Sequence, residues 1–121
     1  MTVEALVPML RCADIGTMVR FYCQTLGFRI DGGDEALGWV SLARDDVSIM
    51  LSRLSEHEGD QRPHFTGSLY FRVDDVDTRW LLLCERATVC YPIEDFPYGM
   101  REFGIYDPEG YLLQFGQPIR S

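Results

Sequence analysis

The sequence predicts an α+β fold made of two tandem βαβββ modules. The first observation is an internal repeat, in which residues 10–23 align with residues 71–84 at a constant offset of 61 positions. The identical pairs in this alignment are Arg11 and Arg72, Asp14 and Asp75, Thr17 and Thr78, and Cys23 and Cys84. The second observation is that strand and helix patterns follow each copy in the same order. The third is an Asp-Pro-Glu-Gly turn at residues 107–110, which joins two strand-like segments into a hairpin.

The first module begins with a strand, a helix cap and a helix. Residues 6–12 alternate loosely and predict a strand, placed where the missing N–H of Pro8 is not needed. Asp14 is a typical helix N-cap, and apolar residues follow at helical spacing until Gly27 ends the helix. The remaining predicted elements are a strand at residues 28–30, a turn at residues 31–34, and strands 39–43 and 47–51 joined as a hairpin by residues 44–46.

The second module repeats this order after a polar segment. We place module 1 at about residues 1–53, the linker at 54–66 and module 2 at about 67–121, all within one domain. The predicted elements of module 2 are a strand at residues 69–73, a helix capped by Asp75, a strand at 89–91, a loop at 92–99, and hairpin strands at 100–106 and 111–115. One helix covers only one face of a four-stranded sheet, so we expect the modules to form a curved sheet around a concave cleft. Exposed sheet edges favour a dimer.

Composition disfavours several classes of protein. The net charge of -8 argues against nucleic-acid binding, which depends on neutralising phosphates with Lys and Arg. No apolar run approaches the roughly 20 residues of a membrane span, and residues 1–10 lack a signal-peptide pattern, so we expect a cytoplasmic protein. The cysteines are Cys12, Cys23, Cys84 and Cys90. They are too widely spaced for a zinc motif, and we expect structural thiols.

Three motifs in this order resemble the vicinal oxygen chelate superfamily of glyoxalases, extradiol dioxygenases, fosfomycin-resistance enzymes and bleomycin-resistance proteins. The motifs are Arg-Phe-Tyr at residues 20–22 with Leu-Gly-Phe at 26–28, Val-Asp-Asp-Val at 73–76, and the Asp-Pro-Glu-Gly turn. The resemblance covers nearly the whole chain and implies the paired βαβββ fold. Residues 97–103, Pro-Tyr-Gly-Met-Arg-Glu-Phe, are most similar to the bleomycin-resistance branch. That branch implies a homodimer that sequesters a flat cationic antibiotic, with the residue at Tyr98 stacking on the ligand.

The resemblance also implies where a metal would bind. Superfamily enzymes generally hold a divalent metal through His, Glu or Gln from the first and fourth strands of each module. The corresponding positions here are Val7, Met50, Ser68 and Gln114, of which only Gln114 is a plausible ligand. His57 and His64 lie in the linker, although a linker folded over the cavity would bring His64 closer. We therefore expect no metal, no cofactor and no catalytic set of residues.

Strand alternation suggests which residues line the cavity. The expected lining is apolar with scattered hydrogen-bonding groups, which suits a flat organic ligand. The candidate ligand-binding residues are Trp39, Met50, Ser68, Tyr70, Tyr98, Met100, Arg101 and Gln114. Arg101 and Glu102 are neighbours on one strand, so only one of them can point inward. An alternative for Trp39, Met50 and Tyr70 is that they are ordinary sheet core.

Two classes of function remain. The first is a metal-independent binding protein of the bleomycin-resistance type, which sequesters a flat hydrophobic or cationic ligand, such as a bleomycin-like compound, at a dimer groove. The alternative is an enzyme, either a metal-dependent lyase or dioxygenase of the same superfamily or a metal-free isomerase. The absence of a recognisable nucleophile, base or metal motif makes the binding protein the favoured hypothesis.

Overall fold

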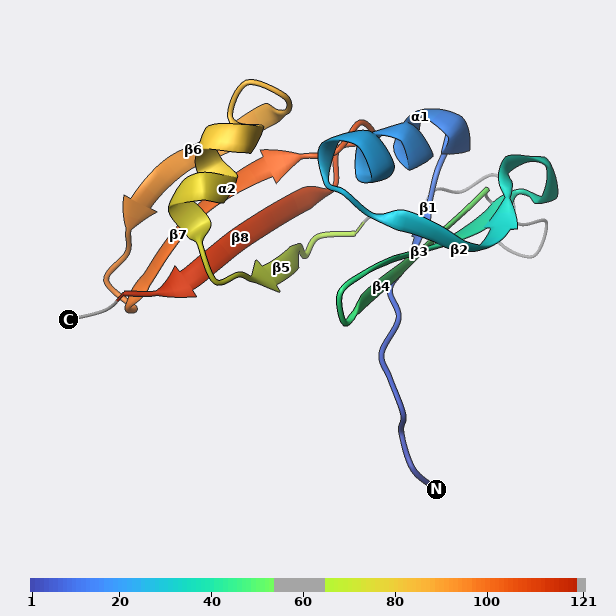
Figure 1. Cartoon of the computed structure of the whole chain (residues 1–121), viewed down its shortest axis with the longest axis horizontal. Coiled ribbons are helices and arrows are strands. Elements are labelled where there is room, and N and C mark those ends of the chain that lie inside the picture. The colour runs from blue at the N-terminus through green and yellow to red at the C-terminus, as the bar shows by residue number, and fades with distance from the viewer. Residues whose placement is uncertain (54–64, 120–121) are drawn as a thin grey trace. The chain divides into compact units, whose positions relative to one another are not determined.

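The computed structural model describes residues 1–53 and 65–119. The chain divides into two compact units, Met1–Pro63 and His64–Ser121. Strands in the first unit have the order β1-β4-β3-β2, and those in the second have the order β5-β8-β7-β6 (Figure 1). In each unit the first strand pairs in parallel with the fourth, and the other pairs are antiparallel. The predicted α+β fold of two βαβββ modules is therefore confirmed.

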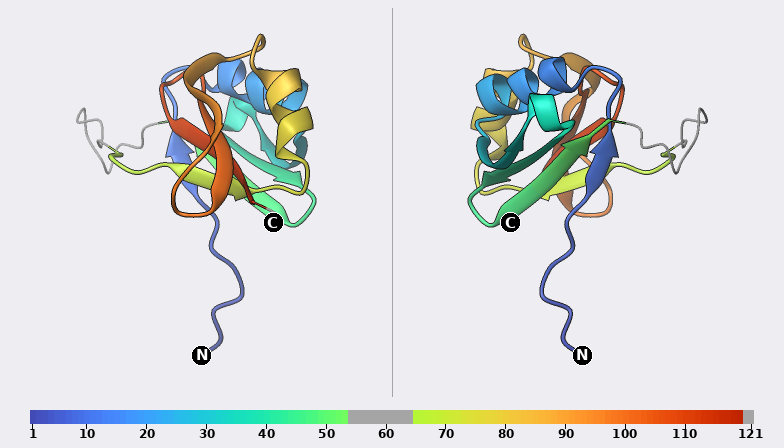
Figure 2. Two further views of the ribbon diagram at one scale, coloured as in Figure 1. Left: turned by 90° about the vertical axis from the view of Figure 1, so that its left-hand side faces the viewer. Right: turned by 90° about the vertical axis from the view of Figure 1, so that its right-hand side faces the viewer.

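One helix lies against one face of each sheet (Figures 1 and 2). The first unit contains β1 (Met9–Arg11), α1 (Ile15–Arg20), a π-helical turn η1 (Phe21–Thr25), β2 (Arg29–Asp34), a 3-10 turn η2 (Glu35–Leu37), β3 (Trp39–Arg44) and β4 (Val47–Ser52). The second unit contains β5 (Leu69–Arg72), α2 (Val76–Leu83), β6 (Thr88–Asp95), β7 (Met100–Tyr106) and β8 (Leu112–Pro118). No described helix is long and apolar enough to cross a membrane.

The two helix starts explain the identities in the sequence repeat. Asp14 accepts hydrogen bonds from the backbone N–H of Thr17 at 3.1 Å and from its hydroxyl at 2.8 Å. Asp75 accepts the same pair of bonds from Thr78, at 3.2 and 2.8 Å. Such a cap satisfies an N–H group that the first helical turn leaves without a partner. The hydrogen bonds from the threonines also lower the pKa of both aspartates.

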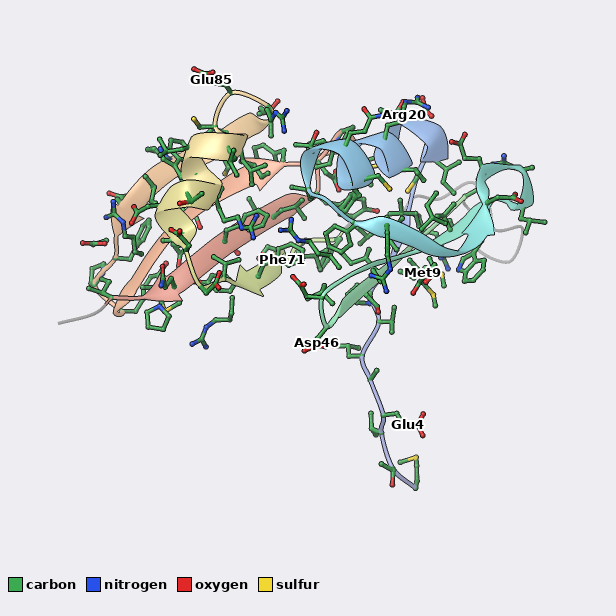
Figure 3. All side chains as sticks on the ribbon, in the orientation of Figure 1. Glu4, Met9, Arg20, Asp46, Phe71 and Glu85 are labelled. Atoms are coloured by element: carbon green, nitrogen blue, oxygen red, sulfur yellow. The ribbon has the colours of Figure 1, made fainter. Side chains whose placement is uncertain are left out.

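Aromatic rings form the core of the second unit. Phe71 on β5 stacks on Phe115 of β8, and Phe115 stacks on Phe103 of β7, each pair with ring centroids 5.1 Å apart (Phe71 is labelled in Figure 3). Trp80 of α2 lies over Phe103 at a centroid distance of 5.2 Å. These contacts assign one face of the sheet to α2. Because side chains alternate along a strand, the residues next to Phe103 lie on the opposite face.

The core of the first unit is largely aliphatic. Its buried side chains include Ile15, Met18, Val19 and Tyr22 from the helical segment and Val40, Leu42, Ile49 and Leu51 from the sheet. Alternation again places the intervening residues of β3 and β4 on the face away from α1.

Residues 31–34, which were predicted as a turn, belong to β2 instead. A Cβ atom on Gly33 would lie 2.2 Å from the backbone oxygen of Trp39 and 2.5 Å from its ring. Gly33 also has a φ of +67°, which glycine adopts readily. The turn follows at η2 and ends at Gly38, whose φ is +75°. The prediction was wrong because a strand glycine that leaves room for a neighbouring backbone and ring cannot be told from a turn glycine in the sequence.

The strand predicted at residues 89–91 extends further, since β6 continues through Pro92 to Asp95. Shifts of register between Val89 and Tyr91, and between Tyr91 and Glu94, mark irregular pairing around the proline. Only residues 96–99 therefore remain as the loop before β7.

The predicted turn at residues 107–110 is confirmed. One carboxylate oxygen of Asp107 accepts hydrogen bonds from the backbone N–H groups of Glu109 and Tyr111, each at 3.0 Å. Gly110 adopts a φ of +93°, which favours glycine.

The cysteines form no disulfide in the described part of the chain, and their exposure differs. Cys12 is buried, Cys23 and Cys84 are half-buried, and Cys90 is exposed. The linker histidines, His57 and His64, lie outside the described residues. The curved cleft between modules and the dimer stay predictions.

Candidate functional site

A buried carboxylate lies on the face of the second sheet that points away from α2. Glu102 on β7 is only 1% exposed. Tyr70 donates a hydrogen bond to its Oε1 atom at 2.9 Å, and Tyr91 donates one to its Oε2 atom. The neighbouring Phe103 faces α2, so alternation directs Glu102 to the other face. The sheet thus holds an acidic group at nearly full burial, with two phenols as donors.

The hydrogen bonds continue across the sheet from these tyrosines. Gln114 on β8 donates from Nε2 to the Tyr91 oxygen at 2.9 Å, and Ser68 donates to the Oε1 atom of Gln114. Tyr98 joins from the loop before β7, where it stacks on Phe96, which in turn contacts Tyr91, and where burial and the Glu102 carboxylate raise its pKa. We call Ser68, Tyr70, Tyr91, Tyr98, Glu102 and Gln114 the tyrosine–glutamate cluster. It unites β5, β6, β7 and β8 in one polar network.

Two glycines provide the space that the tyrosine rings occupy. A Cβ atom on Gly116 would lie 1.9 Å from the Tyr70 hydroxyl, and one on Gly104 would lie 2.4 Å from the Tyr91 ring. Glycine inside a strand weakens it, because it packs no side chain and loses more entropy on folding. Glycine at these two positions therefore lowers the stability of the strands, but it leaves room for both rings to lie over the sheet beside Glu102.

The cluster keeps its phenols protonated. Burial, followed by the hydrogen bond to Glu102, raises the pKa of Tyr70 to about 12. Burial and the Glu102 carboxylate likewise raise the pKa of Tyr98 to about 12. The same two causes raise the pKa of Tyr91, whereas its hydrogen bond with Gln114 acts in the opposite direction. All three phenols therefore remain donors through the neutral pH range.

These raised values predict a loss of stability at alkaline pH. A phenol whose pKa is higher in the folded state stabilises the fold below the ordinary tyrosine value of about 10. That contribution is lost as pH rises from there toward the pKa of Tyr70 in the folded protein, about 12. We expect the urea midpoint to fall over this interval. Tyrosinate absorbance of the folded protein should show late ionisation, and Glu102→Gln should shift part of it to lower pH. An identical titration curve in that variant would contradict the role given to Glu102.

The structure brings together four of the eight predicted ligand-binding residues, Ser68, Tyr70, Tyr98 and Gln114, in the cluster. Met100 shares the Glu102 face of β7 by alternation. The other predicted residues are placed elsewhere. Trp39 and Met50 lie in the first unit, on the face of its sheet away from α1, where Met50 pairs with Ser41.

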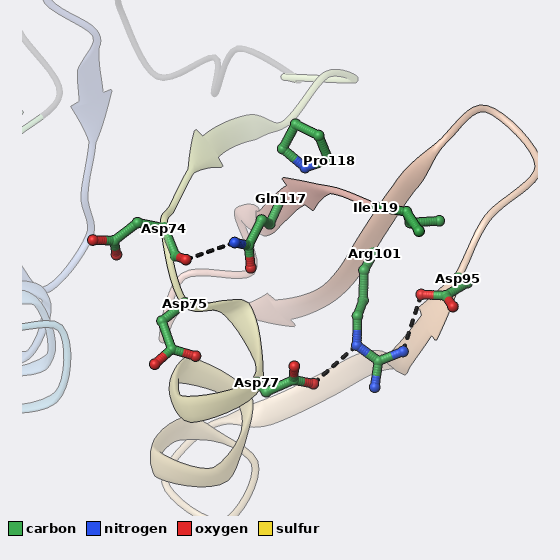
Figure 4. A pocket seen from close by; sticks show the side chains of 8 residues that line it. All are labelled: Asp74, Asp75, Asp77, Asp95, Arg101, Gln117, Pro118 and Ile119. Atoms are coloured by element: carbon green, nitrogen blue, oxygen red, sulfur yellow. Dashed lines mark hydrogen bonds and ion pairs between the residues drawn. The ribbon is translucent and has the colours of Figure 1, made fainter. Parts of the chain in front are cut away.

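Arg101 lies on the α2 side of its sheet and is not part of the cluster. Its Nε atom contacts Asp77 at 2.9 Å and its Nη1 atom contacts Asp95 at 3.0 Å (Figure 4). Of the two neighbours Arg101 and Glu102, it is therefore Glu102 that points into the cluster. Sequence reasoning missed Glu102 and Tyr91 as site residues. Tyr91 lies between two register shifts of β6, so simple alternation does not assign its face.

The Arg101 contacts form one side of a pocket of about 370 Å³ at the start of α2 (Figure 4). Its lining residues are Asp74, Asp75, Asp77, Asp95, Arg101, Gln117, Pro118 and Ile119. Gln117 donates to the backbone oxygen of Asp74 at 2.6 Å and accepts from the backbone N–H of Val76 at 3.1 Å. These bonds tie the start of α2 to β8.

The positions that the resemblance links to metal ligands do not fit a divalent ion. In the second unit, the Gln114 side-chain oxygen already accepts a hydrogen bond from Ser68. In the first unit, Val7 has no ligating atom and Met50 offers only a thioether, which suits softer metals. Within residues 1–53 and 65–119, no three His, Cys, Asp or Glu side chains gather to hold a metal ion.

Solved structures of similar fold include two proteins that bind antibiotics. TnmS3, an antibiotic binding protein from Streptomyces sp. CB03234, has a TM-score of 0.76 at 25% identity, covering 98% of this chain and 99% of that one. The bleomycin-binding protein from bleomycin-producing Streptomyces verticillus, complexed with copper(II)-bleomycin, has a TM-score of 0.70 at 26% identity, covering 95% and 96%. A superfamily member from Sphaerobacter thermophilus DSM 20745 has a TM-score of 0.80 at 22% identity, covering 96% and 98%, and shows the shared fold.

The sequence itself gives the family. No curated protein matches the chain. The family model described as Glyoxalase/Bleomycin resistance protein/Dioxygenase superfamily matches residues 5–115. This match spans both modules and all three motifs that carry the resemblance. The chain therefore belongs to the glyoxalase/bleomycin resistance protein/dioxygenase superfamily.

Proposed function

We propose that this protein binds a small organic ligand without a metal, as an antibiotic-binding member of its superfamily. The tyrosine–glutamate cluster is the observation that carries the proposal. Its Tyr98 side chain is 64% exposed beside the buried Glu102, so an aromatic surface adjoins fixed polar groups. That combination suits recognition of a flat ligand, because rings provide contact area and polar groups provide orientation. The antibiotic-binding neighbours TnmS3 and the bleomycin-binding protein support this proposal.

The chemistry of the cluster favours binding over catalysis. Its hydroxyl and amide groups are hydrogen-bonded to one another, and its carboxylate accepts from two tyrosines. This arrangement holds donors and acceptors in place but pairs no nucleophile with a base. The alternative, a metal-dependent lyase or dioxygenase, requires ligands that the motif positions do not supply.

The remaining predicted features complete the proposal. We retain Trp39, Met50, Met100 and Arg101 as proposed ligand-binding residues beside the four in the cluster. We also propose a homodimer that acts in the cytoplasm without nucleic-acid or membrane partners. Light scattering at micromolar concentration tests the dimer, because a monomer at that concentration would contradict it.

Calorimetric titration with metal-free bleomycin tests the proposed function. We expect saturable binding, and we expect Tyr98→Ala to weaken it about fivefold to tenfold by removing an aromatic contact. Tyr106→Ala is the matched control, since Tyr106 is a partly exposed tyrosine near the other end of β7 and should leave the affinity unchanged.

Metal analysis of the dialysed protein separates the two functional classes. The binding protein should retain no stoichiometric metal and should bind the antibiotic equally with and without a chelator. A retained metal together with loss of binding after chelation would reject the metal-independent function.

A further inference from the structure

Glu102 places a negative charge in the cluster without a matching positive charge. Arg44 pairs with Asp45 and Arg101 with Asp77 and Asp95, and among the described residues no ion pair involves Glu102. Its two hydrogen-bond donors are the neutral phenols Tyr70 and Tyr91. A buried carboxylate is costly when only neutral groups solvate it, and a cation nearby offsets that cost. Glutamine in this place would remove the charge but keep only one acceptor oxygen, whereas the carboxylate accepts from both phenols, one on each oxygen.

The charges near the cluster also favour the binding of a cation there. After burial, Glu102 and then Glu94 raise the pKa of Tyr98, so two acidic groups act on that exposed ring. Arg72 is the basic residue that affects Tyr70, and its effect on the Tyr70 pKa is the last and smallest of the causes. Arg72 is itself exposed to solvent, which screens its charge.

The Tyr70 oxygen is a hydrogen-bond acceptor through which a bound cation can interact with the Glu102 charge. Its hydroxyl proton is donated to Glu102, so the lone pairs of its oxygen remain available as acceptors. None of the described residues donates a hydrogen bond to that oxygen, and the side chain is 41% exposed. Donation to a carboxylate polarises the phenol and strengthens its oxygen as an acceptor. A ligand N–H group that reaches this hydroxyl would therefore meet an acceptor of raised strength.

Aromatic faces surround the same acidic group. Tyr98 stacks on Phe96 with centroids 5.5 Å apart, and Phe96 meets Tyr91 edge to face at 5.6 Å. The rings of Tyr70 and Tyr91 lie over Gly116 and Gly104. Aromatic faces attract cations through their quadrupoles, and the attraction grows where water is displaced. This region therefore combines three tyrosines, a phenylalanine and a carboxylate, all of which favour binding of a positively charged organic group.

We propose that the cluster binds the cationic nitrogen of its ligand, a protonated amine or amidinium whose N–H groups donate to Tyr70 and whose charge is stabilised by Glu102 and the surrounding rings. This inference rests on the proposed function and narrows its ligand class. Neutral and anionic aromatic compounds bind less well, because they leave the carboxylate charge uncompensated. The chain's overall charge of -8 also favours the approach of cations.

Benzamidine and its neutral counterpart benzamide test the charge requirement. We expect benzamidine to bind the wild-type protein about tenfold more tightly than benzamide in calorimetric or NMR titrations. Glu102→Gln should reduce this preference to near unity. Glu85→Gln is the matched control, because it removes one charge at an exposed position after α2 and should preserve the preference (Glu85 is labelled in Figure 3).

Phenyltrimethylammonium, a cation without N–H groups, tests the hydrogen bond separately. Tyr70→Phe keeps the ring and removes the acceptor, so it should weaken benzamidine severalfold and leave phenyltrimethylammonium nearly unchanged. Tyr106→Phe makes the same chemical change away from Glu102 and should affect neither compound. This variant set stays informative if Glu102→Gln fails to fold.

The outcomes separate the two proposals. The cation inference is overturned if benzamide binds as tightly as benzamidine, or if Glu102→Gln keeps the preference for benzamidine. In either case, binding of bleomycin would still support the proposed function. Failure of benzamidine to bind would overturn the inference, and failure of bleomycin as well would remove support for both.

Discussion

Phe103→Ala is expected to destabilise the protein by about 3–5 kcal/mol, the largest effect that we predict for a single core substitution. Phe103 is fully buried, stacks on Phe115 and packs against Trp80 of α2. Removing its ring leaves a cavity where the sheet meets the helix, and the rigid rings around it relax only partly. Urea unfolding, followed by tryptophan fluorescence, to which both Trp80 and Trp39 contribute, measures the change.

Two variants control for this effect. Phe103→Leu retains most of the volume and should cost less than Phe103→Ala. Leu81→Ala removes an apolar side chain from α2 that is 74% exposed, so it should change stability little. A loss in Phe103→Ala no larger than in Leu81→Ala would show that the stacked rings do not support the unit.

Gly116→Ala is expected to destabilise the protein by about 1–3 kcal/mol through the hydrogen bond between Tyr70 and Glu102. The added Cβ atom would lie 1.9 Å from the Tyr70 hydroxyl and 2.7 Å from its Cζ atom. The ring must therefore swing away, and the buried carboxylate loses a donor. Ligand affinity should fall with stability, because the same ring supplies the proposed acceptor.

A double-mutant cycle separates this effect from ordinary strand propensity. In a Tyr70→Ala background the obstacle is gone, so Gly116→Ala should become neutral or stabilising by up to about 1 kcal/mol. Gly99→Ala is the control: its Cβ meets nothing within 4 Å, while its φ of +88° opposes alanine. Its cost should be the same with and without Tyr70. Equal costs of Gly116→Ala in both backgrounds would exclude the proposed coupling.

The two predictions concern opposite faces of the same sheet. The face toward α2 is stabilised by stacked apolar rings, whereas the opposite face carries a carboxylate, three phenols and an amide. Burying Glu102 does not maximise stability, because desolvation of the charge opposes folding. Its retention is explained if the charge serves ligand binding, which is why stability and affinity should both be measured for each cluster variant.

Several features were predictable from the sequence because they depend on neighbours along the chain. Asp14 and Asp75 each cap a helix through a threonine three positions later, and this short spacing is visible in the repeat. The turn at residues 107–110 likewise requires only local hydrogen bonds and one glycine. The order of strands followed from apolar patterns, although glycines near Trp39 were mistaken for a turn.

The candidate site could be predicted only in part. Alternation correctly grouped Ser68 with Tyr70 on one strand face and placed Arg101 and Glu102 on opposite faces. It did not show which of the two faced α2. Nor did it show that Tyr91 belongs to the site, because the shifts of register around Pro92 interrupt the simple pattern of β6.

By itself the sequence determined the repeated module, its helix caps and its closing turn, because their interactions join residues a few positions apart. Only the tertiary structure decided that Glu102 lies beneath Tyr70 and Tyr91, residues that are distant from it along the chain. Such contacts depend on strand register and on which face α2 covers. Both strand register and the covered face are set by burial of the whole sheet rather than by local preference. For this physical reason the position of Glu102 could be read only from the tertiary structure.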